Sequence, residues 1–91
     1  MILVHGILRL ELPEAHSLKG RRRIVHSLKE RLKAFNISVL DISGEYVREA
    51  ELALAWLAHD SRQAAQIRQS VERTMERHFP ELFWELELEE F

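Results

Sequence analysis

The sequence contains no cysteine, and it has only two prolines and three glycines among its 91 residues. Without cysteine the chain has no disulfide, no thiolate nucleophile and no cysteine-based zinc or iron–sulfur centre. With so few glycines it has no glycine-rich phosphate loop. No apolar run approaches the roughly 20 residues that a membrane-spanning helix needs. These absences leave a small globular protein that works through ordinary polar, charged and apolar side chains.

The composition predicts one domain that covers residues 1–91. Hydrophobic residues make up 46% and charged residues 31% of the chain, which is a globular balance. The first residues, MILVHGILRLEL, have no basic region before their apolar positions, so we expect no signal peptide and a cytoplasmic protein. Arginine outnumbers lysine by ten to three, a bias reported in some thermophilic families. The expected class is therefore a small cytoplasmic protein, with a thermophilic source as a secondary prediction.

Four segments have the patterns of strands. Residues 2–12 alternate, with Val4, Leu8 and Leu10 on one side and His5 and Arg9 on the other. Residues 37–43 are short and β-branched, and residues 83–90 alternate glutamate with apolar positions. Residues 51–59 are apolar on both sides, which is typical of a central strand.

Two segments have the period of helices. Ser17 offers an N-cap hydroxyl, and an apolar stripe follows it to Phe35, with Asn36 suited to the left-handed turn that closes a helix. A second stripe begins after Asp60 or Ser61 and ends before Pro80. The two stripes contain Ile24, Val25, Leu28, Leu32 and Phe35 in the first helix and Ala64, Ile67, Val71, Met75 and His78 or Phe79 in the second.

The order of these elements, β-α-β-β-α-β, predicts an α+β fold. Two right-handed β-α-β crossovers interleave into an antiparallel sheet of order 4-1-3-2, with both helices on one face. This is the ferredoxin-like sandwich.

Positive charge is concentrated at the start of the first helix. Residues 17–35 contain seven lysines and arginines and a single glutamate, although the whole chain has a net charge of −2. The helix dipole disfavours cations at this end, and the free N–H groups there attract anions. We therefore predict an anion or RNA contact, with solvation or pairing of the arginines with Glu11 or Glu14 as the alternative. The predicted site consists of Ser17, Lys19, Arg21, Arg22, Arg23, Lys29 and Lys33.

The open side of the sheet is predicted not to bind RNA. Many domains of this topology stack bases on aromatic residues of the two central strands, but no aromatic residue occupies those positions here. Trp56 and Trp84 are expected in the core instead. The same side presents a small apolar patch that could pair two copies into a homodimer; its residues are Ile7, Ala53, Ala55 and Leu57.

No catalytic, metal or cofactor site is predicted. The serines lie in no nucleophile elbow, and no two of the five histidines lie four residues apart on a helix. Acyl-phosphate hydrolases of this fold use a glycine-rich first loop and an asparagine on a central strand, and the chain has neither. We therefore expect a protein without enzymatic activity.

The run PEAHSLKGRRRIVHSLKERLKAFNISV, with AELALAWLAHDSRQAAQI after it, resembles the YlxP-like family of bacterial proteins of unknown function. The strongest parts of the match are Ser17 to Arg23 and Phe35 to Val39. The resemblance implies a ferredoxin-like fold, and an association with translation and ribosome maturation because members are commonly encoded among such genes. It implies no catalytic residue. The chain departs from the family at Glu45-Tyr46-Val47-Arg48, where relatives have an acidic residue and a Trp-Gln pair.

The leading functional hypothesis is a small non-catalytic protein that associates with RNA or a ribosomal subunit through the start of the first helix. The alternative is a protein–protein interaction module that forms a homodimer through its open sheet.

Overall fold

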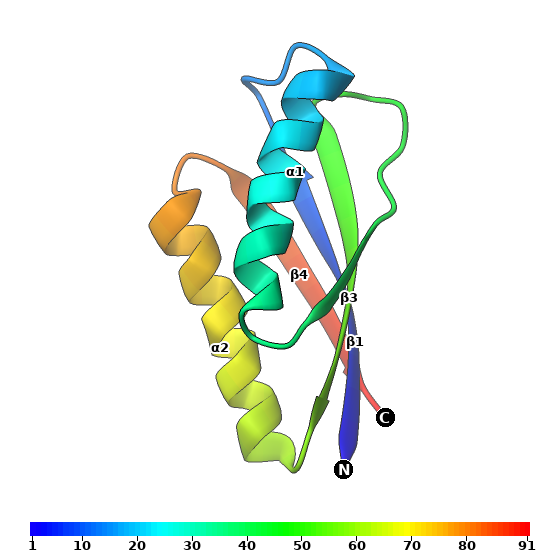
Figure 1. The fold of residues 1–91 in the computed structure, drawn as a ribbon, viewed down its shortest axis with the longest axis vertical. Helices are drawn as coiled ribbons and strands as arrows, with labels where there is room; N and C mark the ends of the chain where they lie inside the picture. The colour runs from blue at the N-terminus through cyan, green and yellow to red at the C-terminus, as the bar shows by residue number, and fades with distance from the viewer.

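The computed structural model describes residues 1–91 and has the predicted order of elements (Figure 1). Four antiparallel strands form one sheet in the order β2-β3-β1-β4, and both helices lie on one face of it. The α+β, ferredoxin-like prediction is confirmed. The elements are β1 (Ile2–Glu11), α1 (Leu18–Lys33), β2 (Ser38–Asp41), β3 (Glu49–Ala58), α2 (Ser61–His78) and β4 (Phe83–Glu90).

The two central strands, β1 and β3, pair along their whole length, from Ile2 opposite Ala58 to Glu11 opposite Glu49. Because side chains alternate along a strand, the even-numbered residues of both strands face the helices and the odd-numbered residues face outward. Leu8 and Leu52 are fully buried on the inner side. Each central strand therefore supplies half of its residues to the core and half to an open face.

Gly6 allows β4 to lie close to β1. A Cβ atom at this position would lie 2.9 Å from the backbone oxygen of Glu87 and would overlap the Leu88 side chain. Real Cβ contacts are longer, so any larger residue would push β4 away. Gly6 is a packing requirement of the sheet rather than a turn residue.

Side-chain caps begin both helices, and a residue in the left-handed conformation follows the end of α1. The Ser17 hydroxyl accepts from the Gly20 amide at 3.0 Å, and the Asp60 carboxylate accepts from the Gln63 amide at 2.8 Å. Asn36 has φ of 61°, the left-handed conformation expected after α1. The two helices run in opposite directions and are offset, so that each covers a different end of the sheet (Figure 1).

Several predicted boundaries were wrong by a few residues. The predicted strand 37–43 is shorter, because only Ser38–Asp41 pairs with β3. β3 begins two residues earlier than expected, at Glu49, since it pairs with the full length of β1. Phe35 is 36% exposed rather than part of the core, because α1 ends at Lys33.

Candidate functional site

The first two turns of α1 contain cations and no acidic residue. Lys19, Arg22 and Arg23 are exposed there, and none of them has a carboxylate within 4.0 Å. The proposed pairing of these arginines with Glu11 or Glu14 is therefore wrong. Glu11 cannot reach them because its side chain lies on the open face of the sheet. We call Lys19, Arg22 and Arg23 the basic end.

Arg21 does not belong to the basic end, which corrects the sequence prediction. It is only 8% exposed, and its Nη1 donates to the backbone oxygens of Tyr46 at 3.0 Å and Glu49 at 3.2 Å. Arg21 lies one turn before Val25 on the buried stripe of the helix, so its stem crosses apolar surface and its guanidinium reaches the β2–β3 connection. Its four-residue spacing from Val25 was the signal that could have identified it. Arg21 therefore ties the start of α1 to the connection between β2 and β3.

The two predicted lysines farther along α1 differ in their availability. Lys33 donates to Glu30 Oε1 at 3.1 Å, and this hydrogen bond and charge lower the pKa of Glu30. Lys29 is half-buried. Burial acts to raise the pKa of Asp41, but hydrogen bonds from Ser43 and the charges of Arg21 and Lys29 lower it overall. Lys29 and Lys33 thus have acidic neighbours that the basic end lacks.

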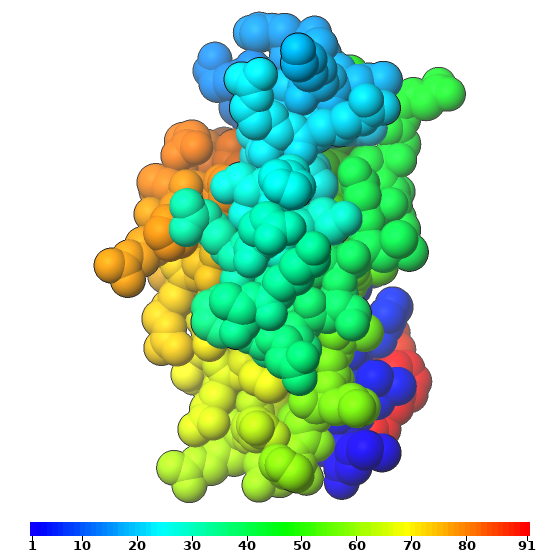
Figure 2. All heavy atoms as spheres, viewed as in Figure 1, coloured from blue at the N-terminus to red at the C-terminus, as the bar shows by residue number.

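A second basic region lies between the two helices and is not part of the predicted site (Figure 2 shows the side on which the helices lie). Arg31 Nη1 lies 3.3 Å from His78 Nε2, so the imidazole accepts in its neutral form. Desolvation by neighbouring groups, together with the charges of Arg31 and Arg77, lowers the pKa of His78, although its side chain is exposed. A groove of about 440 Å³ lies here. We call it the interhelix groove, and its lining is Phe35, Ser70, Arg73, Thr74, Glu76, Arg77 and His78.

The sequence contained a signal for this groove. Arg73 and Arg77 are four residues apart on α2, which places both on one side of the helix. Their position opposite the end of α1 could not be read from the sequence, because it depends on the offset between the helices.

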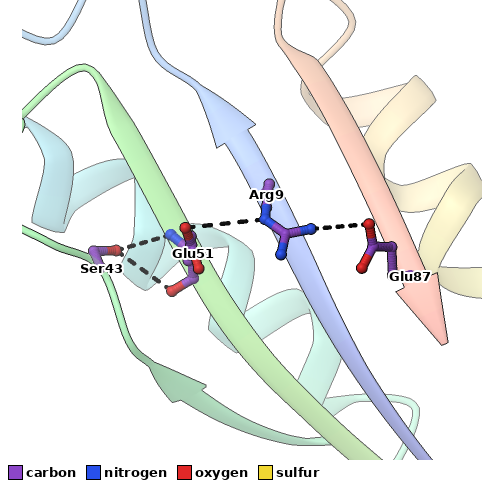
Figure 3. Close-up of polar contacts among 4 residues, drawn as sticks. All are labelled: Arg9, Ser43, Glu51 and Glu87. Carbon is purple, nitrogen blue, oxygen red and sulfur yellow. Dashed lines mark hydrogen bonds and ion pairs between the residues drawn. The ribbon is translucent and has the colours of Figure 1, made fainter. Parts of the chain in front are cut away.

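The open face of the sheet has the predicted character. The outward positions of β1 and β3 hold no aromatic residue, while Trp56 is buried and Trp84 packs against the core. Arg9 is the single cation on this face; it lies between Glu51 at 4.0 Å and Glu87 at 3.2 Å (Figure 3). The predicted dimer patch is brought together, with Ile7 opposite Ala53 and with Leu57, which is 59% exposed, on the same face.

The structure brings no three histidine, aspartate or glutamate side chains into a geometry that could hold a metal ion. Neither helix is both long and apolar enough to cross a membrane.

Comparison with known proteins gives a family and a fold. A family model described as "Protein of unknown function (DUF503)" matches residues 4–87. No curated protein matches the chain.

Solved structures with the same architecture have low sequence identity. The de novo designed protein LFR1 1 with ferredoxin fold has a TM-score of 0.64 at 14% identity, over 97% of this chain and 85% of that one. The de novo designed protein Foldit4 has a TM-score of 0.62 at 14% identity, over 98% and 97% of the two chains. A dimeric ferredoxin-like protein from an uncultured marine organism has a TM-score of 0.51 at 8% identity, over 98% and 92%. At these identities the likeness shows the fold alone.

Proposed function

The chain belongs to the DUF503 family of proteins of unknown function. From the charges on its surface, we propose that it is a non-catalytic RNA-binding protein that associates with a ribosomal subunit. The contact runs through the basic end, and the interhelix groove supplies further arginines. The proposal includes a cytoplasmic location and the finer placement among YlxP-like proteins, which the run from Ser17 to Arg23 supports.

One observation carries this proposal: Lys19, Arg22 and Arg23 are exposed at the unfavourable end of a helix dipole and have no carboxylate partner. A phosphate placed there would meet three cations and the free amide groups of the first turn. Phosphate contacts of this kind do not read base sequence, so the expected preference is for a backbone shape.

The test is co-sedimentation with ribosomal subunits at low and moderate salt. The wild type should co-sediment, and its association should weaken steeply between about 50 and 200 mM salt. The double variant Arg22→Glu/Arg23→Glu should lose the association. The matched control, Arg62→Glu/Arg68→Glu, changes the net charge equally on the first half of α2 and should retain it. Equal co-sedimentation of the two double variants would show that the basic end does not contact the ribosomal subunit.

A homodimer is the second candidate, because six of the ten exposed large hydrophobic residues lie on the open side of the sheet: Leu3, Leu40, Ile42, Leu57, Phe83 and Phe91. The marine ferredoxin-like protein is described as dimeric, which supports the same idea. Sedimentation equilibrium should then show a dimer that Leu57→Lys converts to a monomer. A wild type that stays monomeric at every concentration would exclude this candidate.

A further inference from the structure

The open face carries a large excess of negative charge. Arg9 is its single lysine or arginine, and it already pairs with Glu51 and Glu87 (Figure 3). The remaining outward carboxylates of the sheet have no ion-pair partner. The six outward glutamates are Glu11, Glu49, Glu51, Glu85, Glu87 and Glu89.

A groove of about 420 Å³ lies at the end of this face where β1 ends and β4 begins. Its lining combines four carboxylates with apolar surface, including Phe83, which is 74% exposed. A lysine or arginine side chain needs both kinds of surface, because its stem is apolar and its head is charged. We call this cavity the acidic groove, and its lining is Arg9, Leu10, Glu11, Glu49, Ala50, Glu51, Phe83, Trp84 and Glu85.

A row of carboxylates leads away from the acidic groove along β4. Glu85, Glu87 and Glu89 recur every second residue on the outward side of this strand. Their spacing is therefore about 6.7 Å, which is also the distance between alternate side chains of any extended chain. A partner segment laid along β4 can bring successive basic residues onto successive glutamates.

We infer that the acidic groove and the glutamate row bind an extended, lysine- or arginine-rich segment of another protein. Charge complementarity favours this occupant over a second copy, whose open face would add six more carboxylates. The repeat along β4 and the apolar lining favour a peptide over a small polyamine. The inference does not depend on the RNA proposal, because the basic end lies at the start of a helix on the other side of the sheet.

The experiment measures fluorescence anisotropy of two short labelled peptides of equal composition. In the first, lysine alternates with threonine; in the second, the lysines form one block. The wild type should bind the alternating peptide several-fold more tightly. Glu49→Gln/Glu85→Gln should weaken that binding about tenfold, since each carboxylate lost removes one charge contact.

The matched control is Glu14→Gln/Glu76→Gln, which changes the net charge equally at exposed positions outside the groove. It should shift the affinity less than about twofold, as expected for distant screened charges. Circular dichroism melts establish that both variants fold. Equal loss in the two variants, equal affinity for the two peptides, or full displacement by equimolar spermidine would overturn the inference. A wild type that sediments as a dimer, together with a Glu49→Gln/Glu85→Gln variant that sediments as a monomer, would also overturn the inference, because a second copy would then cover the acidic groove.

Discussion

The helical side and the open face of this protein carry opposite charge and neutralise it differently. On the open face, Arg9 lies between Glu51 and Glu87 and is the one cation among six glutamates. On the helical side, Lys19, Arg22 and Arg23 have no carboxylate partner. The strands' two-residue period directs the glutamates outward, and the helices supply the cations. A net charge of −2 for the whole chain therefore describes neither surface.

Three arginines on these two surfaces have three different roles. Arg9 neutralises carboxylates, Arg21 holds backbone carbonyls, and Arg22 faces solvent without a partner. The residue type is the same in each case, so the position on its element decides the role. Each role has a different expected response to mutation.

The largest expected effect comes from Arg21, and it would show that the three consecutive arginines do not have the same role. Arg21→Met keeps the apolar stem but leaves the backbone oxygens of Tyr46 and Glu49 without their charged donor. Such losses cost about 3 kcal/mol of the free energy of unfolding. The neighbouring Arg22→Met should change it by less than about 0.5 kcal/mol. Urea denaturation of both variants measures the difference, and equal stabilities would contradict the buried role of Arg21.

The next effect compares the two sides of β1. Gly6→Ala places a Cβ against the Glu87 backbone oxygen and the Leu88 side chain, so β4 must shift. Overpacking of this kind costs about 2 kcal/mol. Ile7→Ala, on the open face one residue away, should cost about half as much because Ile7 is only half-buried. Thermal melts rank the two variants, and a larger loss for Ile7→Ala would mean that the open face is covered in solution.

Most of the architecture was predictable from the sequence, but the burial and the partners of individual lysines and arginines were not. The alternation in residues 2–12 and the stripes after Ser17 and Asp60 determine the strands, the helices and their order. The burial of Arg21 could not be separated from the basic run by charge alone, since it depends on carbonyls that the β2–β3 connection brings from residues 46 and 49. The interhelix groove depends on the offset of two helices, which no local pattern encodes.

The third effect tests how the open face tolerates its charge. Arg9→Gln removes the single outward cation between two exposed glutamates, and it should cost at most about 1 kcal/mol because such pairs are solvent-screened. Glu11→Gln should stabilise the fold by a few tenths of a kcal/mol, since Glu11 lies directly opposite Glu49. Both changes should shrink in high salt. Urea denaturation at low and high salt measures them, and salt-independent effects would show that packing rather than charge is responsible.

The smallest expected effect concerns His78, on the helical side of the molecule. Its pKa lies below the ordinary value of 6.5, because desolvation by neighbouring groups and the charges of Arg31 and Arg77 disfavour the imidazolium. The unfolded chain therefore binds the proton more readily, so the stability contributed by His78 is complete above pH 6.5 and is lost as the pH falls through the lower folded pKa.

Protonation would also add a third cation beside Arg31 and Arg77 and end the acceptor role of Nε2. RNA affinity, measured by filter binding at constant salt, should thus rise modestly on acidification toward about pH 5. His78→Asn should remove that part of the rise, while His16→Asn, outside the interhelix groove, should retain it. If the RNA affinities of His78→Asn and of the wild type depend equally on pH, the bound RNA contacts the basic end and does not reach the interhelix groove.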